Sequence, residues 1–314
     1  PGIVFSGIRN GNETERQGDT GAFWGSNTQG RPYAYRMGVY TNGIDAISGA
    51  TRSVGFSVRC IADSFWNIAD MQEMTSDTCA PANTPASTAT NIDTDGTHAD
   101  DDSYVPQRTL YDIRDGNSYR IRKLADGNCW MTENLKLIST SDITIKPIDS
   151  DVTSNFTLKA SNSGTWCTDQ TAECYDQSYA LDSGQNDYGA YYNWYAATAG
   201  TGTYDTVSGN APSSICPKGW RLPTGGSGGE FEDLTTKYNT YTSLMHITDF
   251  KLAGSKYDTM HYVNELGYYW SSTPIGDTAG QNIGTYRLRL DTSAVRPVDG
   301  AYKYFGFSVR CVSK

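Results

Sequence analysis

Side chains that could bind a hard cation recur in the segment from Asn91 to Asp102, which reads NIDTDGTHADDD. Counting from its first residue, oxygen ligands fall at positions 1, 3, 5 and 12. They are Asn91, Asp93, Asp95 and Asp102. This is the spacing of an EF-hand calcium loop, in which position 6, here Gly96, must turn sharply and position 12 supplies a carboxylate. The segment predicts a calcium site that stiffens this part of the chain and takes no part in catalysis.

The same segment has a second interpretation. Position 12 is an aspartate, shorter than the usual glutamate, and position 8 is His98, where an apolar residue is expected. No helical pattern is obvious on either side of the segment. A solvated acidic linker, common between extracellular modules, has the same composition, so the sequence leaves both interpretations open.

Residues for other kinds of chemistry are scarce. The chain has three histidines, at positions 98, 246 and 261, which leaves little material for histidine-based catalysis. Serine-nucleophile, HExxH and phosphate-loop motifs are absent. Glu230 and Glu232 are most simply a solvated helix face. We expect no enzymatic activity and no cofactor other than calcium.

The chain has seven cysteines, together with 32 glycines and 22 tyrosines. No two cysteines are spaced as CxxC and no histidine stands near them, which argues against a zinc site. Disulfide bonds in an oxidising compartment are the favoured interpretation, and free thiols in a reducing compartment are the alternative. We therefore expect an extracellular protein. Because the count is odd, one cysteine lacks a partner within these 314 residues.

The net charge of −10 excludes some partners. Nucleic acids and anionic membrane surfaces are bound by clustered Lys and Arg, and acidic residues outnumber basic ones here, 35 to 25. No stretch approaches the length of a membrane span. We expect no nucleic-acid partner and no membrane span, and we expect the numbering to begin inside a longer precursor.

Two parts of the chain repeat each other. Gly55–Cys60 and Gly306–Cys311 both read GFSVRC, and Gly21–Asn27 (GAFWGSN) is similar to Gly267–Thr273 (GYYWSST). The offset between the copies is 246 residues at the aromatic motif and 251 at the cysteine motif, so the second copy carries five extra residues.

The repeat predicts how the chain is divided. Residues 1–62 are the C-terminal half of a first module, and residues 107–314 are a complete second module. A short helix or turn and an acidic, Thr- and Pro-rich linker would occupy residues 63–106.

Most elements of the complete module are expected to be strands. A hairpin is predicted around the turn Asp115–Asn117, and a buried strand at Cys129–Leu137. One helix is predicted after Ser227. The chain returns to strands in its last fifty residues. The fold class is α+β and β-dominated, with few helices.

Six ordered motifs of the chain resemble the Fibrobacter succinogenes major paralogous domain. They are LYDIRDGNSY (110–119), CWMTENL (129–135), YYNWYAA (191–197), CPKGWRLPT (216–224), YWSST (269–273) and GFSVRC (306–311). The resemblance covers 107–314 and, as a second half, 1–61. It implies a C-type-lectin-like or formylglycine-generating-enzyme-like fold. Such domains occur on secreted and surface proteins, often in tandem and mostly without an assigned activity.

The implied fold also suggests how the cysteines pair. Its terminal strands meet, which pairs Cys216 with Cys311. Cys167 and Cys174 would close a short loop, and Cys79 would bond to Cys129. Cys60 would be left unpaired, because the counterpart of Cys216 is missing from the first copy.

Two functions follow from the resemblance. The first is a non-catalytic structural or adhesive protein of the bacterial cell surface. Such a protein could also be the subunit of a filament in which neighbouring copies pack head to tail. The alternative is a module that binds a glycan or a protein surface. The calcium–sugar signatures of C-type lectins, EPN and QPD, are absent. Four tryptophans stand inside the family motifs and are expected in the core; they are Trp130, Trp194, Trp220 and Trp270.

Overall fold

The computed structural model describes most of the chain. The described residues are 8–10, 13–15, 18–28, 33–57, 68–79, 84–98, 100–161, 166, 171–185, 187–238, 240–276 and 284–313. The chain forms two compact units, Pro1–Asp63 and Ser64–Lys314. Cys60 and Cys167, two of the predicted site residues, lie outside the described residues.

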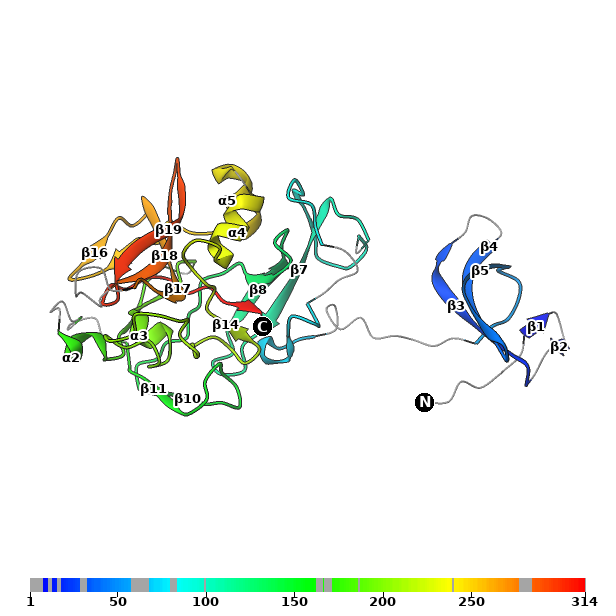
Figure 1. The fold of residues 1–314 in the computed structure, drawn as a ribbon, viewed down its shortest axis with the longest axis horizontal. Helices are drawn as coiled ribbons and strands as arrows, with labels where there is room; N and C mark the ends of the chain where they lie inside the picture. The colour runs from blue at the N-terminus through cyan, green and yellow to red at the C-terminus, as the bar shows by residue number, and fades with distance from the viewer. Residues whose placement is uncertain are drawn as a thin grey trace. The chain divides into compact units, whose positions relative to one another are not determined.

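The first unit contains a three-stranded antiparallel sheet (Figure 1). Its strands are β3 (Thr20–Thr28), β4 (Tyr33–Tyr40) and β5 (Gly43–Thr51), and a short ladder pairs β1 (Ile8–Asn10) with β2 (Glu13–Glu15). Among the described residues of this unit, the buried apolar side chains are Ala22, Phe23 and Val39.

A six-stranded sheet runs through the second unit, in the order β14-β20-β9-β8-β7-β6. Its strands are β6 (Asn91–Asp93), β7 (Tyr104–Tyr111), β8 (Ser118–Lys123), β9 (Cys129–Met131), β14 (Trp220–Arg221) and β20 (Val312–Ser313). The predicted hairpin is present, because β7 and β8 pair from Gln107↔Arg122 to Tyr111↔Ser118. The strand predicted at Cys129–Leu137 is shorter, since only β9 pairs. The strand β20 lies between β14 and β9 (Figure 1).

A second sheet of the same unit has three antiparallel strands, β17 (Leu266–Pro274), β18 (Gly284–Asp291) and β19 (Val295–Tyr302). Three short ladders complete the strands: β10 (Ile143–Ile145) with β11 (Phe156–Leu158), β12 (Ala180–Asp182) with β13 (Ala190–Tyr192), and β15 (Ser255–Lys256) with β16 (Met260–His261). The helices are α2 (Ala172–Tyr175), α3 (Trp194–Ala197), α4 (Glu230–Lys237) and α5 (Tyr241–Thr248), with a 3-10 turn η1 at Met71–Glu73. The fold is therefore α+β and β-dominated, as predicted.

The core of the second unit is built on the four tryptophans that the motifs placed there. Each is at most 1% exposed, and each indole N–H has an acceptor, as buried tryptophans require. The acceptors are Asp126 Oδ2 for Trp130, the Ser271 carbonyl for Trp194, the Met71 carbonyl for Trp220 and the Tyr192 carbonyl for Trp270, at 2.6–2.8 Å. The prediction that these rings are core residues is confirmed.

Disulfide bonds join two pairs of core cysteines. Cys216 and Cys311 bring the start of the β14 region to the last strand, with Cα atoms 5.9 Å apart. Cys79 and Cys129 are bonded with Cα atoms 6.1 Å apart. Both pairs are those that the resemblance implied. Cys174 is also disulfide-bonded, and its expected partner, Cys167, is not among the described residues.

The segment predicted as a short helix or turn followed by an acidic linker, residues 63–106, belongs to the second unit from Ser64 onward. Met71 and Met74 are fully buried in its core, and the carbonyl of Ile68 accepts a hydrogen bond of 2.7 Å from Arg108. β6 pairs in parallel with β7, from Asn91↔Tyr104 to Asp93↔Pro106. The 3-10 turn η1 lies in the part predicted as a helix or turn, and Cys79 and β6 attach the part predicted as a linker to the rest of the unit.

The repeat seen in the sequence is also present in the backbone. The strands β3, β4 and β5 match β17, β18 and β19 in order and pairing register. Both sheets change register at the same place, after Trp24 in the first unit and after Trp270 in the second. The bridge Phe23↔Ser57 has its counterpart in Tyr269↔Ser308. The five extra residues fall between β17 and β18.

Candidate functional site

The acidic loop lies between β6 and β7. The carboxylate of Asp93, at the end of β6, is 2% exposed. Its Oδ1 accepts the backbone N–H groups of Asp95 and Gly96 at 3.2 and 2.9 Å, and its Oδ2 accepts that of His98 at 3.1 Å. Gly96 has φ +81°, the left-handed conformation that glycine adopts without cost. The predicted sharp turn at this position is therefore present.

The ligand set of this loop differs from the predicted one. Ligand atoms of Asp93, Asp95 and His98 lie within 4.8 Å of one another. The group therefore includes His98, which stands where an EF-hand loop has an apolar residue. Among the described acidic residues Asp102 is not part of this group, and its carbonyl accepts from Ala86 at 2.7 Å. Asn91 is exposed at the start of β6. Strands flank the loop where an EF-hand has helices, and the ligand set Asn91, Asp93, Asp95 and Asp102 stays a prediction.

Internal hydrogen bonds hold the acidic loop in shape. Asp95 Oδ1 accepts from the backbone and the hydroxyl of Thr97 at 3.0 and 2.8 Å. The hydroxyl contact, followed by the backbone contact, lowers the pKa of Asp95. The ring of His98 stacks on Tyr104 with centroids 3.8 Å apart.

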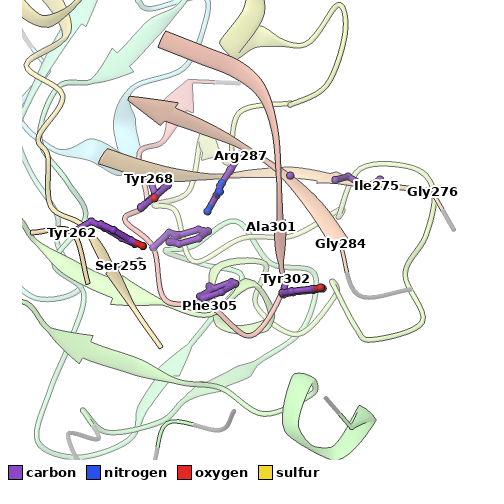
Figure 2. Close-up of a pocket in the computed structure, with 12 residues that line it drawn as sticks. Ser255, Tyr262, Tyr268, Ile275, Gly276, Gly284, Arg287, Ala301, Tyr302 and Phe305 are labelled. Carbon is purple, nitrogen blue, oxygen red and sulfur yellow. The ribbon is translucent and has the colours of Figure 1, made fainter. Parts of the chain in front are cut away.

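A cavity of about 590 Å³ opens on the sheet formed by β17, β18 and β19. Figure 2 shows its lining, which consists of Ser255, Tyr262, Tyr268, Ile275, Gly276, Gly284, Arg287, Gly300, Ala301, Tyr302, Phe305 and Phe307. This volume is within the range of sites for small molecules, roughly 300–1,000 Å³.

Aromatic rings form a stacked series along the cavity. Tyr268 and Phe307 stack with centroids 4.9 Å apart, and Phe307 stacks on Phe305 at 5.7 Å and 8°. Tyr302 continues the series beyond Phe305 at 6.1 Å. The inner ring of Tyr268 is 5% exposed and Tyr302 is 40% exposed, so the series leads from the core to the solvent. Tyr262, on the rim, is also exposed.

Arg287 is the polar centre of the cavity (Figure 2). Its guanidinium carbon lies 4.3 Å from the ring centroid of Tyr268 and 5.0 Å from that of Phe307. Its Nε and Nη2 each lie 2.9 Å from Asp299 Oδ2. Burial lowers the pKa of Arg287, and the carboxylate of Asp299 opposes that shift.

The sheet register explains why these groups meet. Arg287 in β18 lies directly opposite Asp299 in β19, and residues opposite each other project from the same face. Gly300 keeps the wall open, because a Cβ there would lie 2.8 Å from Cδ1 of Ile275.

None of the sequence motifs predicted this cavity. The available signal was the close spacing of aromatic residues in the segment from Tyr302 to Phe307 (YKYFGF).

Residues 125–243 match the family model of the Fibrobacter succinogenes major domain. The recognition made from the motifs is thereby confirmed over these residues. Three of the six motifs, CWMTENL, YYNWYAA and CPKGWRLPT, lie inside the matched span. The cavity is lined by residues 255–307, which lie beyond it. No curated protein and no solved structure matches the chain. Within the described residues, no helix has the length and apolar character needed to cross a membrane.

Proposed function

We propose that the chain is a non-catalytic adhesive protein of the bacterial cell surface, and that its second unit adheres by binding a saccharide in the aromatic cavity. The observation that carries this proposal is the stacked series Tyr268, Phe307, Phe305 and Tyr302 beside the guanidinium of Arg287.

The chemistry of the cavity suits a sugar ring. Sugars present apolar C–H faces, which pack on aromatic rings, and polar edges, which need fixed hydrogen-bonding groups. The exposed ring of Tyr302 offers an aromatic surface for the C–H face. The hydroxyl groups of Tyr262 and Ser255 and the guanidinium of Arg287 offer hydrogen-bonding groups for the polar edges.

The cysteines support a location outside the cell. Cys79, Cys129, Cys216 and Cys311 form two buried disulfide bonds, and such bonds persist mainly in oxidising compartments. We place the protein at the bacterial surface on this chemistry together with the family resemblance.

A second candidate function is structural, as a subunit that assembles with neighbouring copies. In the second unit, Tyr192 of β13 pairs with Phe307 through two backbone hydrogen bonds of 3.0 Å, and its carbonyl accepts from Trp270. In the first unit, Phe56 corresponds to Phe307 and Trp24 corresponds to Trp270. No strand equivalent to β13 pairs with them among the described residues. Unpaired strand edges can take up a strand from another molecule. Negative-stain microscopy of native material tests this function, which requires ordered polymers.

The calcium site predicted at Asn91, Asp93, Asp95 and Asp102 stays a prediction, and the residues whose ligand atoms the structure groups are Asp93, Asp95 and His98. The grouping of their ligand atoms supports it, while the hydrogen bonds that already occupy Asp93 support a loop that is stable without metal.

A glycan array tests the main proposal. We expect the full chain to bind a restricted set of saccharides, and Tyr302→Ala to weaken that binding by roughly tenfold, about 1.4 kcal/mol. Tyr111→Ala is the matched control, because Tyr111 is a strand tyrosine that is 56% exposed and does not line the cavity. Equal losses in both variants, or no binding by the unmodified chain, would contradict the proposal.

A further inference from the structure

We propose that the saccharide carries a carboxylate group and that Arg287 binds this group. The inference rests on the proposed function and narrows its ligand to acidic sugars, such as those of the uronic acid type.

The charge of the lining favours an acidic ligand. Arg287 is the one charged residue among the twelve described residues that line the cavity. The other polar side chains there are hydroxyl groups, from three tyrosines and one serine. Sites for neutral sugars need acceptors for many hydroxyl donors, and an unmatched polar group loses its hydration without compensation. None of the twelve described lining side chains is a carboxylate or an amide, whereas the guanidinium of Arg287 can donate.

The guanidinium has donors to spare. Nε and Nη2 of Arg287 are directed at Asp299, while its Nη1 has no hydrogen-bond partner within the described part of the chain. Guanidinium groups bind carboxylates through paired, charge-assisted hydrogen bonds. The rings of Tyr268 and Phe307 hold the plane of the guanidinium in place, so little side-chain freedom is lost on binding.

A second arginine adds positive charge to the same face of the sheet. Arg289 lies opposite Tyr268 in the pairing of β17 with β18. Its Nε is buried and has no hydrogen-bond partner, and no ion pair to Arg289 occurs among the described residues. Arg287 and Arg289 together outweigh the carboxylate of Asp299. The face is therefore locally positive in a chain whose net charge is −10.

The first unit lacks the aromatic part of this site. Arg36, the counterpart of Arg287, also lies over a ring, with 5.5 Å to the centroid of Phe56. The counterparts of Tyr268, Tyr302 and Phe305 are Ala22, Thr51 and Val54. The inference therefore assigns acidic-saccharide binding to the second unit alone, although both units share the same sheet.

Titration calorimetry of the full chain with a matched pair of saccharides tests the inference. The probes are an oligogalacturonide and the same oligomer with its carboxyl groups reduced to alcohols. We expect the acidic oligomer to bind at least tenfold more tightly, and added salt to weaken its binding because the attraction is partly electrostatic. Asp299→Asn removes the competing carboxylate and is expected to tighten binding of the acidic oligomer.

A double variant serves as the loss-of-charge test. Arg287→Gln with Asp299→Asn replaces the ion pair by two amides that can still bond to each other, and an unchanged melting temperature verifies that it folds. We expect it to bind both oligomers equally. Equal affinity of the unmodified chain for the two oligomers would overturn the inference and leave the proposed function standing. If the chain binds neither oligomer and a glycan array yields only neutral ligands, the inference is also overturned. If the array yields no ligand at all, the proposed function is overturned as well.

Discussion

The guanidinium of Arg287 lies over the ring of Tyr268, with 4.3 Å between the guanidinium carbon and the ring centroid. The two residues come from neighbouring strands, β18 and β17. Their contact joins the polar and the aromatic parts of one cavity, and Asp299 on the third strand fixes the arginine from the side. The sheet thus positions Arg287, Tyr268 and Asp299, while Phe305 and Phe307 come from the segment that follows β19.

Filling the cavity should abolish binding while the fold is kept. Gly300 lies on the wall, where a Cβ would meet only the flexible end of Ile275. We expect Gly300→Phe to reduce saccharide affinity by more than tenfold, because its ring would occupy the space of the ligand. Calorimetry of the variant measures the effect. Gly43→Phe is the control, since a Cβ at Gly43 meets nothing within 4 Å and this residue does not line the cavity. A Gly300→Phe variant that binds as the control does would show that the ligand lies elsewhere.

Removing a disulfide should destabilise the second unit. Cys216 and Cys311 are 95 residues apart in the sequence, and the chain-entropy treatment of so long a loop gives roughly 4–5 kcal/mol. We expect Cys216→Ala with Cys311→Ala to lower the free energy of unfolding by about 2–5 kcal/mol. Denaturant unfolding of oxidised protein provides the measurement. The matching double variant at Cys79 and Cys129 should lose a similar amount. No loss in either variant would contradict a structural role for these bonds.

Calcium should stabilise the acidic loop if the predicted site is occupied. We expect added calcium to raise the melting temperature of the full chain by a few degrees, which corresponds to about 1 kcal/mol or somewhat more in a domain of this size. Asp95→Asn should remove this rise, because Asp95 is an exposed member of the ligand group. Asp142→Asn, at an exposed carboxylate outside the group, is the control. An identical melting curve with calcium and with a chelator would exclude the site.

Buried tyrosines should make the fold sensitive to alkali. Burial raises the pKa of Tyr238 to about 12, while in the unfolded chain the group titrates near 10. The folded state therefore keeps a proton that the unfolded state loses, so stability is complete below pH 10 and falls as the pH rises towards 12. Burial raises the pKa of Tyr119 and Tyr191 in the same direction. Tyr238→Phe should flatten part of this fall between pH 10 and 12, as measured by chemical unfolding at each pH. A variant with the unmodified slope would contradict the assignment.

The sequence predicted the parts of the fold that depend on local pattern and repetition. The two copies of GFSVRC and of the aromatic motif predicted a repeated half-module, and each unit contains a three-stranded sheet at the repeated residues. The motif tryptophans were correctly placed in the core, because large rings in ordered motifs are usually packed. The turn Asp115–Asn117 indicated its hairpin through residues that favour tight turns.

The cavity could not be predicted in the same way. It depends on the pairing of Arg287 with Asp299, and a register shift between Arg287 and Arg289 moves the strands past one another at this place. Spacing along the chain does not reveal such a shift. The turn at Gly96 was predicted, but the return of His98 towards Asp93 was not. His98 contacts Asp93 through its backbone N–H and stacks its ring on Tyr104.

The most direct test of the central claim is a crystal structure of the full chain with the tightest saccharide from the array. The account predicts a sugar ring packed on Tyr302 and Phe305, with a polar group of the sugar within hydrogen-bonding distance of Arg287. A saccharide bound elsewhere on the chain, with this cavity empty, would contradict it.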